Sequence, residues 1–247
     1  MSSSHSKKIA SCLIAVLLTQ LPYYLNAQVL FETLAATKSQ GTINIYGRGN
    51  LSPSLPYENI KGSAFWSDEW KTATLYGFHA NEKWEQPIKL NLATHEIYFK
   101  NKDGEELVIN NGLVQKIVFH DANDPAKIEA VFLYGLRPPF ISNLTTDNFL
   151  QVLNEGNYQL LKEATRKVTE GDSLFGTLKK YFFTYETTYF ISKKFIVTPL
   201  KKLNKENCLQ ALPVGKNSSE QWITQNKIDL RKEVDVVAFL NFVNKNE

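Results

Sequence analysis

Hydrophobic and polar residues alternate with a period of two through most of the chain from Thr72 to Val197. Aromatic and β-branched residues dominate these runs, and short turn signals separate them at strand-length intervals, as in antiparallel β-proteins. The pattern predicts strands at 72–78, 87–92, 95–100, 106–109, 113–120 and 128–134.

Two dipeptides mark the sharpest turns between these runs, Asp103-Gly104 and Asn111-Gly112. A two-residue hairpin of type I′ needs positive φ at both central positions, which Asn, Asp and Gly adopt most readily. Both dipeptides are therefore predicted to join adjacent strands, which gives a meander.

A second β region is predicted from Phe149 onward. FLQVL, the turn Glu155-Gly156-Asn157 and YQLLKEATRKV form a candidate hairpin, although Leu150, Leu153 and Asn154 also fit a helical period. We favour the hairpin. Between residues 181 and 191 rings alternate with threonines and lie on both faces, which predicts a central strand covered on both sides.

After Pro199 the pattern becomes helical. The expected N-caps are Asn204, then Ser218 or Ser219, then Asp229. The last helix is predicted to bury a broad apolar face, formed by Leu230, Val234, Val237, Leu240, Asn241 and Val243.

These elements predict a mainly β fold, an antiparallel β-sandwich or open barrel with a C-terminal helical segment. Residues 1–27 are expected to be a signal peptide, 28–200 the β domain, and 201–247 a helical segment packed on that domain.

The first 27 residues have the order of a secretory signal. Lys7 and Lys8 precede the apolar run Ile9–Thr19, and Leu25-Asn26-Ala27 ends in a small residue. The run is shorter than the about 20 apolar residues that span a bilayer. We therefore expect cleavage after Ala27, export to the periplasm or beyond, and no membrane span in the mature chain.

The net charge of the chain narrows the classes of partner. The chain has 28 Lys and Arg against 25 Asp and Glu, and Lys7 and Lys8 leave with the predicted signal. The near-neutral remainder has no strong field to attract nucleic acid.

After removal of the predicted signal peptide, Cys208 is the sole cysteine, so no internal disulfide is expected. Its neighbours Leu209 and Leu212 predict a buried thiol.

No catalytic or nucleotide motif is complete. Gly171–Gly176 resembles a nucleophile elbow, but Phe175 stands where the second glycine is needed. Gly47-Arg48-Gly49 and Gly215-Lys216 lack the remaining residues of phosphate-binding loops. No catalytic residue and no cofactor are therefore assigned.

The mature histidines do not have the spacing of a metal site. His79, His95 and His120 are distributed over separate predicted strands without paired spacing. The oxygen-rich segment 121–125 lacks the glycine and glutamate of a calcium loop and is interpreted as a turn. No metal is expected.

Aromatic residues supply the candidate binding surfaces. Trp66, Trp70 and Trp84 lie close together in the sequence, and indoles stack on sugars or anchor protein contacts. Tyr134 and Arg137 flank a loop stiffened by two prolines and form a second candidate. For both groups the alternative is a structural role, in covering one end of the sheet or in a crossover loop.

Several short motifs carry a family resemblance. They are Lys61–Phe65, Ile88–Leu92, His95–Lys100, Val152–Gly156, Leu160–Lys162, Thr187–Tyr189, Lys201–Leu203 and Asn226–Leu230, with a final Asn241. In these the chain resembles a group of uncharacterised, exported β-rich proteins of Gram-negative bacteria. The resemblance implies an exported β-protein with a helical end and brings no activity; Ala64 and Phe65 depart from its pattern.

The sequence therefore predicts an exported, non-enzymatic binding or scaffold module of the bacterial envelope. Its partner would be an envelope protein, a glycan or an apolar ligand. A periplasmic carrier of an apolar ligand or lipid is the first alternative and requires an apolar cavity. A hydrolase whose site is assembled only by folding is the second.

Overall fold

The computed structural model describes residues 37–39, 41–44, 54–79, 82–109, 111–136, 148–171, 179–194, 196–212 and 216–246. The predicted signal peptide and the candidate Arg137 lie outside these residues. Within them, no helix is both long enough and apolar enough to cross a membrane.

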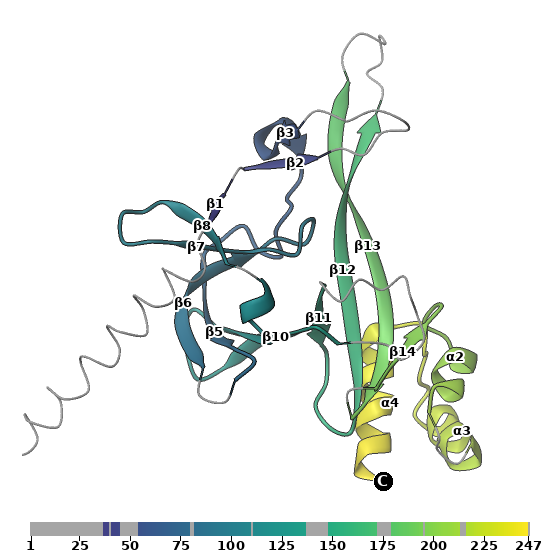
Figure 1. Cartoon of the computed structure of the whole chain (residues 1–247). Coiled ribbons are helices and arrows are strands. Elements are labelled where there is room, and N and C mark those ends of the chain that lie inside the picture. The colour runs from purple at the N-terminus through teal and green to yellow at the C-terminus, as the bar shows by residue number, and fades with distance from the viewer. Residues whose placement is uncertain are drawn as a thin grey trace, which may run out of the picture.

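Most strands of the described chain belong to one large sheet (Figure 1). Its order is β1-β8-β7-β6-β5-β9-β10-β11-β12-β13-β14, all antiparallel, and β4 adds a parallel pairing to β13. The sheet is open and not closed into a barrel. The predicted antiparallel β fold with a C-terminal helical segment is confirmed.

The strands have the following bounds. In the large sheet they are β1 Thr37–Lys38, β4 Ile60–Lys61, β5 Lys71–Tyr76, β6 Lys83–Leu90, β7 Ile97–Lys100, β8 Glu106–Ile109, β9 Lys116–His120, β10 Ile128–Tyr134, β11 Phe149–Val152, β12 Tyr158–Gly171, β13 Lys180–Lys193 and β14 Ile196–Leu200. A separate pair consists of β2 Thr42–Asn44 and β3 Ser54–Pro56.

Asp103-Gly104 joins β7 to β8 as predicted, but by a different turn. The Gly104 N–H donates to the Asn101 carbonyl at 3.0 Å, and the Asn101 N–H donates to the Glu105 carbonyl at 3.0 Å. Gly104 alone has positive φ, 81°, whereas Asp103 does not. The type I′ prediction is therefore wrong, because the loop is one residue too long for it.

The predicted meander ends at Asn111-Gly112, which lies in the 3-10 helix η2 (Asn111–Leu113). The chain then crosses the sheet, and β9 pairs with β5 and β10 instead of β8. Ala73 and Leu75 of β5 have no exposed surface, so β5 needs neighbours on both edges. Strand β9 supplies the second edge and buries Ile117 and Phe119 beside them.

One face of the curved region β5–β10 forms the first hydrophobic core. Register places Ile88 opposite Phe99 and Ala73 opposite Phe119, and all four are buried. Further along β10, Phe132 joins the same cluster. At about 25 cal/mol per Å² of buried apolar surface, the burial of these side chains stabilises this half of the sheet.

Three helices pack beyond β12–β14 and form the second core (Figure 1). They are α2 Lys205–Gln210, α3 Lys216–Gln225 and α4 Glu233–Lys245. Helix α4 buries Val236, Phe239, Leu240 and Val243 against Tyr158, Leu160 and Ile191 of the sheet. Cys208 of α2 is fully buried in this core, as predicted.

Only one of the predicted helix caps is confirmed. Asn204 accepts a hydrogen bond from the Asn207 N–H at 2.8 Å. Helix α3 begins at Lys216, so Ser218 and Ser219 lie inside it and neither is its N-cap residue. The Asp229 prediction is also wrong, since α4 begins at Glu233, and Asp235 instead reaches back to accept the Asp229 N–H at 2.9 Å.

The apolar face of α4 differs in part from the predicted face. Leu240 and Val243 are buried as expected, but Val234 is 70% exposed and Asn241 is exposed. The helix starts later than Asp229, so the docked stripe runs through Val236 and Phe239 instead.

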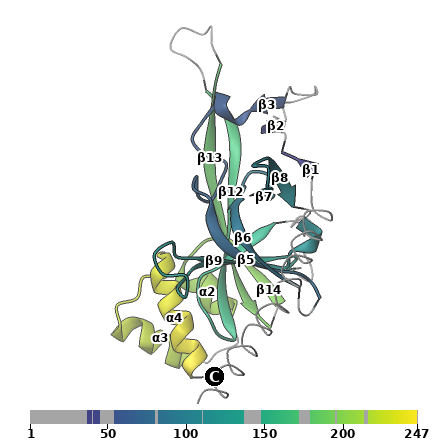
Figure 2. The ribbon, with the colours of Figure 1, turned by 90° about the vertical axis from the view of Figure 1, so that its left-hand side faces the viewer.

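The longest elements are β12 and β13, which form an arm that reaches beyond the rest of the sheet (Figures 1 and 2). Each has 14 residues, paired from Tyr158 opposite Lys193 to Gly171 opposite Lys180. The strand interpretation of residues 158–168 is therefore confirmed. The predicted cover on both faces of β13 is wrong for Thr184–Thr188, which are exposed because the arm leaves the cores there.

Two asparagines hold the turn between β11 and β12 against α4. Asn154 accepts from the Leu160 N–H at 2.7 Å and donates to the Tyr158 carbonyl at 2.9 Å. Asn244 accepts from the Tyr158 N–H at 2.7 Å. Gly156 has φ of 120°, and a Cβ there would lie 2.4 Å from the Asn244 amide, so this approach requires glycine.

Replacing Asn244 with alanine is expected to lower the free energy of unfolding by about 2 kcal/mol. Tyr158 is 2% exposed, and the substitution removes the acceptor for its N–H. Urea denaturation measures the change. Asn246→Ala, an exposed position at the end of the same helix, is the control and is expected to cost less than about 0.5 kcal/mol. Equal effects would contradict the role of Asn244.

Candidate functional site

The segment before β5 places two neighbouring aromatic residues on opposite sides of the sheet. Phe65 forms a β-bridge with Asn91, and the Trp66 N–H donates to the Leu90 carbonyl at 2.9 Å. Successive side chains of an extended segment point to opposite faces. Trp66 accordingly packs on Phe119, with ring centroids 4.5 Å apart, whereas Phe65 contacts Tyr98 at 5.3 Å.

Three of the candidate binding residues line the first core. Trp66, Trp84 and Tyr134 are partly buried and pack against that cluster. The Tyr134 ring lies 5.0 Å from the Phe149 ring and 6.5 Å from the Phe78 ring. The structure therefore separates these rings from Trp70.

Trp70 lies between two lysines. The Lys89 Nζ and the Lys100 Nζ each lie 5.1 Å from its ring centroid, within the range of cation–π attraction. The Lys89 Nζ is also 5.4 Å from the Phe65 ring. Among the described residues, neither amine has a carboxylate within ion-pair distance. We call Phe65, Trp70, Lys89 and Lys100 the Trp70 surface.

The strand register explains how these side chains meet. Lys89 of β6 stands opposite Tyr98 of β7, so both point to the same face. Lys100 follows Tyr98 by two residues and therefore shares that face. Trp70 immediately precedes β5, beside the end of β6 where Lys71 pairs with Ile88.

A row of rings supports the Trp70 surface from behind. Centroid distances are 5.3 Å from Phe65 to Tyr98, 6.1 Å from Tyr57 to Phe65 and 6.1 Å from Tyr57 to Phe183. The Asn91 amide donates to the Tyr57 hydroxyl at 2.9 Å. Burial is the main reason that the pKa of Tyr98 is raised, so its hydroxyl stays protonated. The row therefore supports the Trp70 surface through ring contacts.

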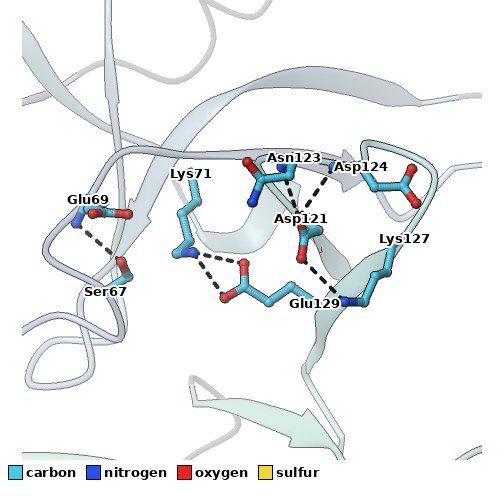
Figure 3. A network of polar contacts seen from close by, with 8 residues as sticks. All are labelled: Ser67, Glu69, Lys71, Asp121, Asn123, Asp124, Lys127 and Glu129. Atoms are coloured by element: carbon cyan, nitrogen blue, oxygen red, sulfur yellow. Dashed lines mark hydrogen bonds and ion pairs between the residues drawn. The ribbon is translucent and has the colours of Figure 1, made fainter.

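Lys71, the residue that follows Trp70, forms an ion pair with Glu129 (Figure 3). The Lys71 amine contacts both carboxylate oxygens of Glu129, at 3.0 and 2.9 Å, and lies 5.9 Å from the Trp66 ring. The hydrogen bond to Glu129 is the main cause that raises the pKa of Lys71. The positive charge of Lys71 is therefore paired with a carboxylate, unlike the charges of Lys89 and Lys100.

Asp121 organises the adjoining turn between β9 and β10 (Figure 3). It accepts the Asn123 N–H at 2.8 Å and the Asp124 N–H at 3.3 Å, and Lys127 lies 3.4 Å away. The Asn123 N–H is the largest cause lowering the pKa of Asp121. A general acid needs the opposite shift, so this network stabilises a turn. Residues 121–125 form the turn that the sequence predicts.

No metal-binding cluster accompanies the Trp70 surface in the parts of the chain that the structure describes. No group of three or more His, Cys, Asp or Glu side chains there is placed to hold a metal ion. The grooves beside α2 and α3 are open and lined mainly by Lys205, Glu206, Gln210 and Glu220.

Lys89, Lys100 and Phe65 are absent from the sequence-based candidates, whereas Trp70 is included. In the sequence they are separated by intervals that follow no motif. The alternation of Tyr98 and Lys100 indicates a shared face, but the pairing of Lys89 with Tyr98 depends on register.

No protein-family model matches this chain, and no curated protein or solved structure shows significant similarity to it.

Proposed function

We propose that this protein is an exported binding module that holds an acidic glycan on the Trp70 surface. The observation that carries the proposal is the position of Trp70 between two lysines that have no anionic partner among the described residues. An indole offers a flat apolar face for a sugar ring. An ammonium attracts the carboxylate or sulfate beside that ring.

The charge of the chain supports a glycan over nucleic acid. Two lysines on an otherwise near-neutral protein provide a local attraction without the extended basic surface that nucleic acid requires. The predicted signal peptide would bring the module outside the cytoplasm.

The two alternatives lack a specific supporting observation. A carrier of apolar ligands needs a large apolar cavity, whereas the grooves beside α2 and α3 are lined mainly by polar side chains. A hydrolase that uses a carboxyl group as its general acid needs a raised pKa there, whereas the pKa of Asp121 is lowered.

Titration calorimetry with oligogalacturonate, alginate oligomers and heparin fragments tests the proposal. Trp70→Ala and the double variant Lys89→Gln, Lys100→Gln are each expected to weaken binding at least about tenfold, or roughly 1.4 kcal/mol. Lys83→Gln, an exposed lysine on β6, is the matched control and is expected to bind like the unmodified protein.

Methyl-esterified oligogalacturonate keeps the sugar rings and removes their charge, so it is expected to bind at least about tenfold more weakly. Added salt is expected to weaken binding of the charged oligomer, because Lys100 is exposed and Lys89 is only half-buried. Failure of all three acidic probes to bind would overturn the proposal, as would binding that is indifferent to Trp70→Ala.

A further inference from the structure

Among the described residues, one edge of β13 has no paired strand in the middle of the arm. Strand β4 pairs with Tyr181 and Phe182, and β14 pairs with Tyr189–Lys193. Gly62 lies beside Phe183, since a Cβ on Gly62 would be 3.6 Å from the Phe183 Cβ. No described strand pairs with this edge at Thr184–Thr188, which we call the open edge.

The side chains of the open edge are also exposed on both faces of the arm. Exposed strand edges bind further strands through their backbone N–H and C=O groups. The neighbouring β4 and β14 limit the added strand to about 17 Å, the length of a short extended segment. Figures 1 and 2 show this part of the arm between the helices at one end and β2–β3 at the other.

Arg166 indicates which partner would fit. Arg166 lies on β12 opposite Tyr185 of β13, and its guanidinium carbon is 3.8 Å from the Tyr185 ring centroid. Its Nε is buried and has no hydrogen-bond partner among the described residues. Tyr185 is 63% exposed, so the guanidinium reaches toward the open edge across an accessible ring.

We propose that the open edge accepts an extended peptide segment of another protein as an added strand, with an acidic side chain of that segment bound by Arg166. A strand paired with β13 lies about 4.8 Å from it. A carboxylate opposite Tyr185 then reaches the guanidinium, whose planar donors suit carboxylates. This surface is separate from the Trp70 surface, and the proposal is independent of glycan binding.

A second copy of the chain fits the open edge less well. Twofold antiparallel pairing centred on the open edge places Glu186 opposite the same residue of the other copy, and like charges directly opposite are unfavourable. The ion pair of Glu186 with Lys167 is solvent-exposed on both sides and offsets little of this repulsion.

The probe is a set of capped, fluorescein-labelled peptides of alternating Thr and Val that carry one Glu at successive positions. Fluorescence anisotropy measures their affinity, and amide hydrogen exchange reports on Thr184–Thr188. At least one peptide is expected to bind, to slow exchange there, and to bind about tenfold more tightly than its Gln counterpart. Methylating the peptide backbone nitrogens is expected to abolish binding.

Arg166→Gln is expected to remove the preference for Glu over Gln, and Lys167→Gln, the next residue on β12, is expected to retain it. Tyr185→Ala, at an exposed position, is a second test of the same preference if Arg166→Gln lowers the melting temperature. Absence of binding in the millimolar range, or a Glu preference that survives both variants, would overturn the proposal. If the amides of the open edge became more protected as the protein concentration rose without any peptide, the edge would pair with a second copy of the chain instead.

Discussion

Replacing Phe239 with alanine is expected to lower the free energy of unfolding by about 3–5 kcal/mol. Phe239 has no exposed surface and lies at the centre of the core between α4 and the sheet. Its ring centroid is 6.1 Å from that of Trp222 on α3, so the substitution leaves a cavity where two helices meet. Urea denaturation followed by circular dichroism measures the loss.

Val234→Ala is the matched control on the same helix. Val234 is 70% exposed, so its truncation is expected to change the free energy of unfolding by less than about 0.5 kcal/mol. The sequence pattern alone predicts the opposite for Val234, because it assigns this residue to the buried face. A loss at Val234 as large as that at Phe239 would contradict the docking of α4 seen in the structure.

Acidification is expected to destabilise the fold through His95. This side chain is 6% exposed, and burial lowers its pKa from 6.5 to about 4. Between these two pH values the unfolded chain binds a proton that the folded chain does not, so stability falls as the pH falls. The full contribution is roughly 3 kcal/mol, from the pKa difference.

His95→Asn isolates this contribution. His95 has φ of 56°, and asparagine tolerates this left-handed conformation better than most residues. The variant is expected to lose about 3 kcal/mol less stability than the unmodified protein between neutral pH and pH about 4. His79→Asn, at an exposed position, is the control and is expected to keep the original pH dependence. If His95→Asn lost as much stability on acidification as the unmodified protein, His95 would not be the group responsible.

The turn that contains His95 also connects the two halves of the sheet. The Leu92 N–H donates to the Ala64 carbonyl at 2.7 Å, and the Leu92 carbonyl accepts the Arg166 N–H at 3.0 Å. The same turn therefore supports the segment that carries Trp70 and the middle of the arm. A proton on His95 is expected to weaken the support of both proposed surfaces.

The sequence predicts local features of this fold well. Strands 106–109 and 128–134 have the predicted bounds, and Asn204 caps α2 as predicted. Each depends on residues close together in the chain: alternation sets the faces of a strand, and a cap needs a side chain within three residues. The predicted start of α4 is wrong because Asp229 satisfies the same local rule as a true cap.

Only the tertiary structure decides the candidate sites. Trp66 and Trp70 look equivalent in the sequence, yet the pairing of residues 64–66 with residues 90–92 turns Trp66 into the core, and Trp70 lies between Lys89 and Lys100. The open edge of β13 likewise depends on where β4 and β14 end.

By itself, the sequence determined the β class, the helical end and the strands β5 to β13, because these follow from the periodicity of neighbouring residues. The tertiary structure decided the strand order, the crossover to β9 and the partners of Trp70 and Arg166. Register and long-range pairing bring together residues whose separation in the chain carries no periodic signal.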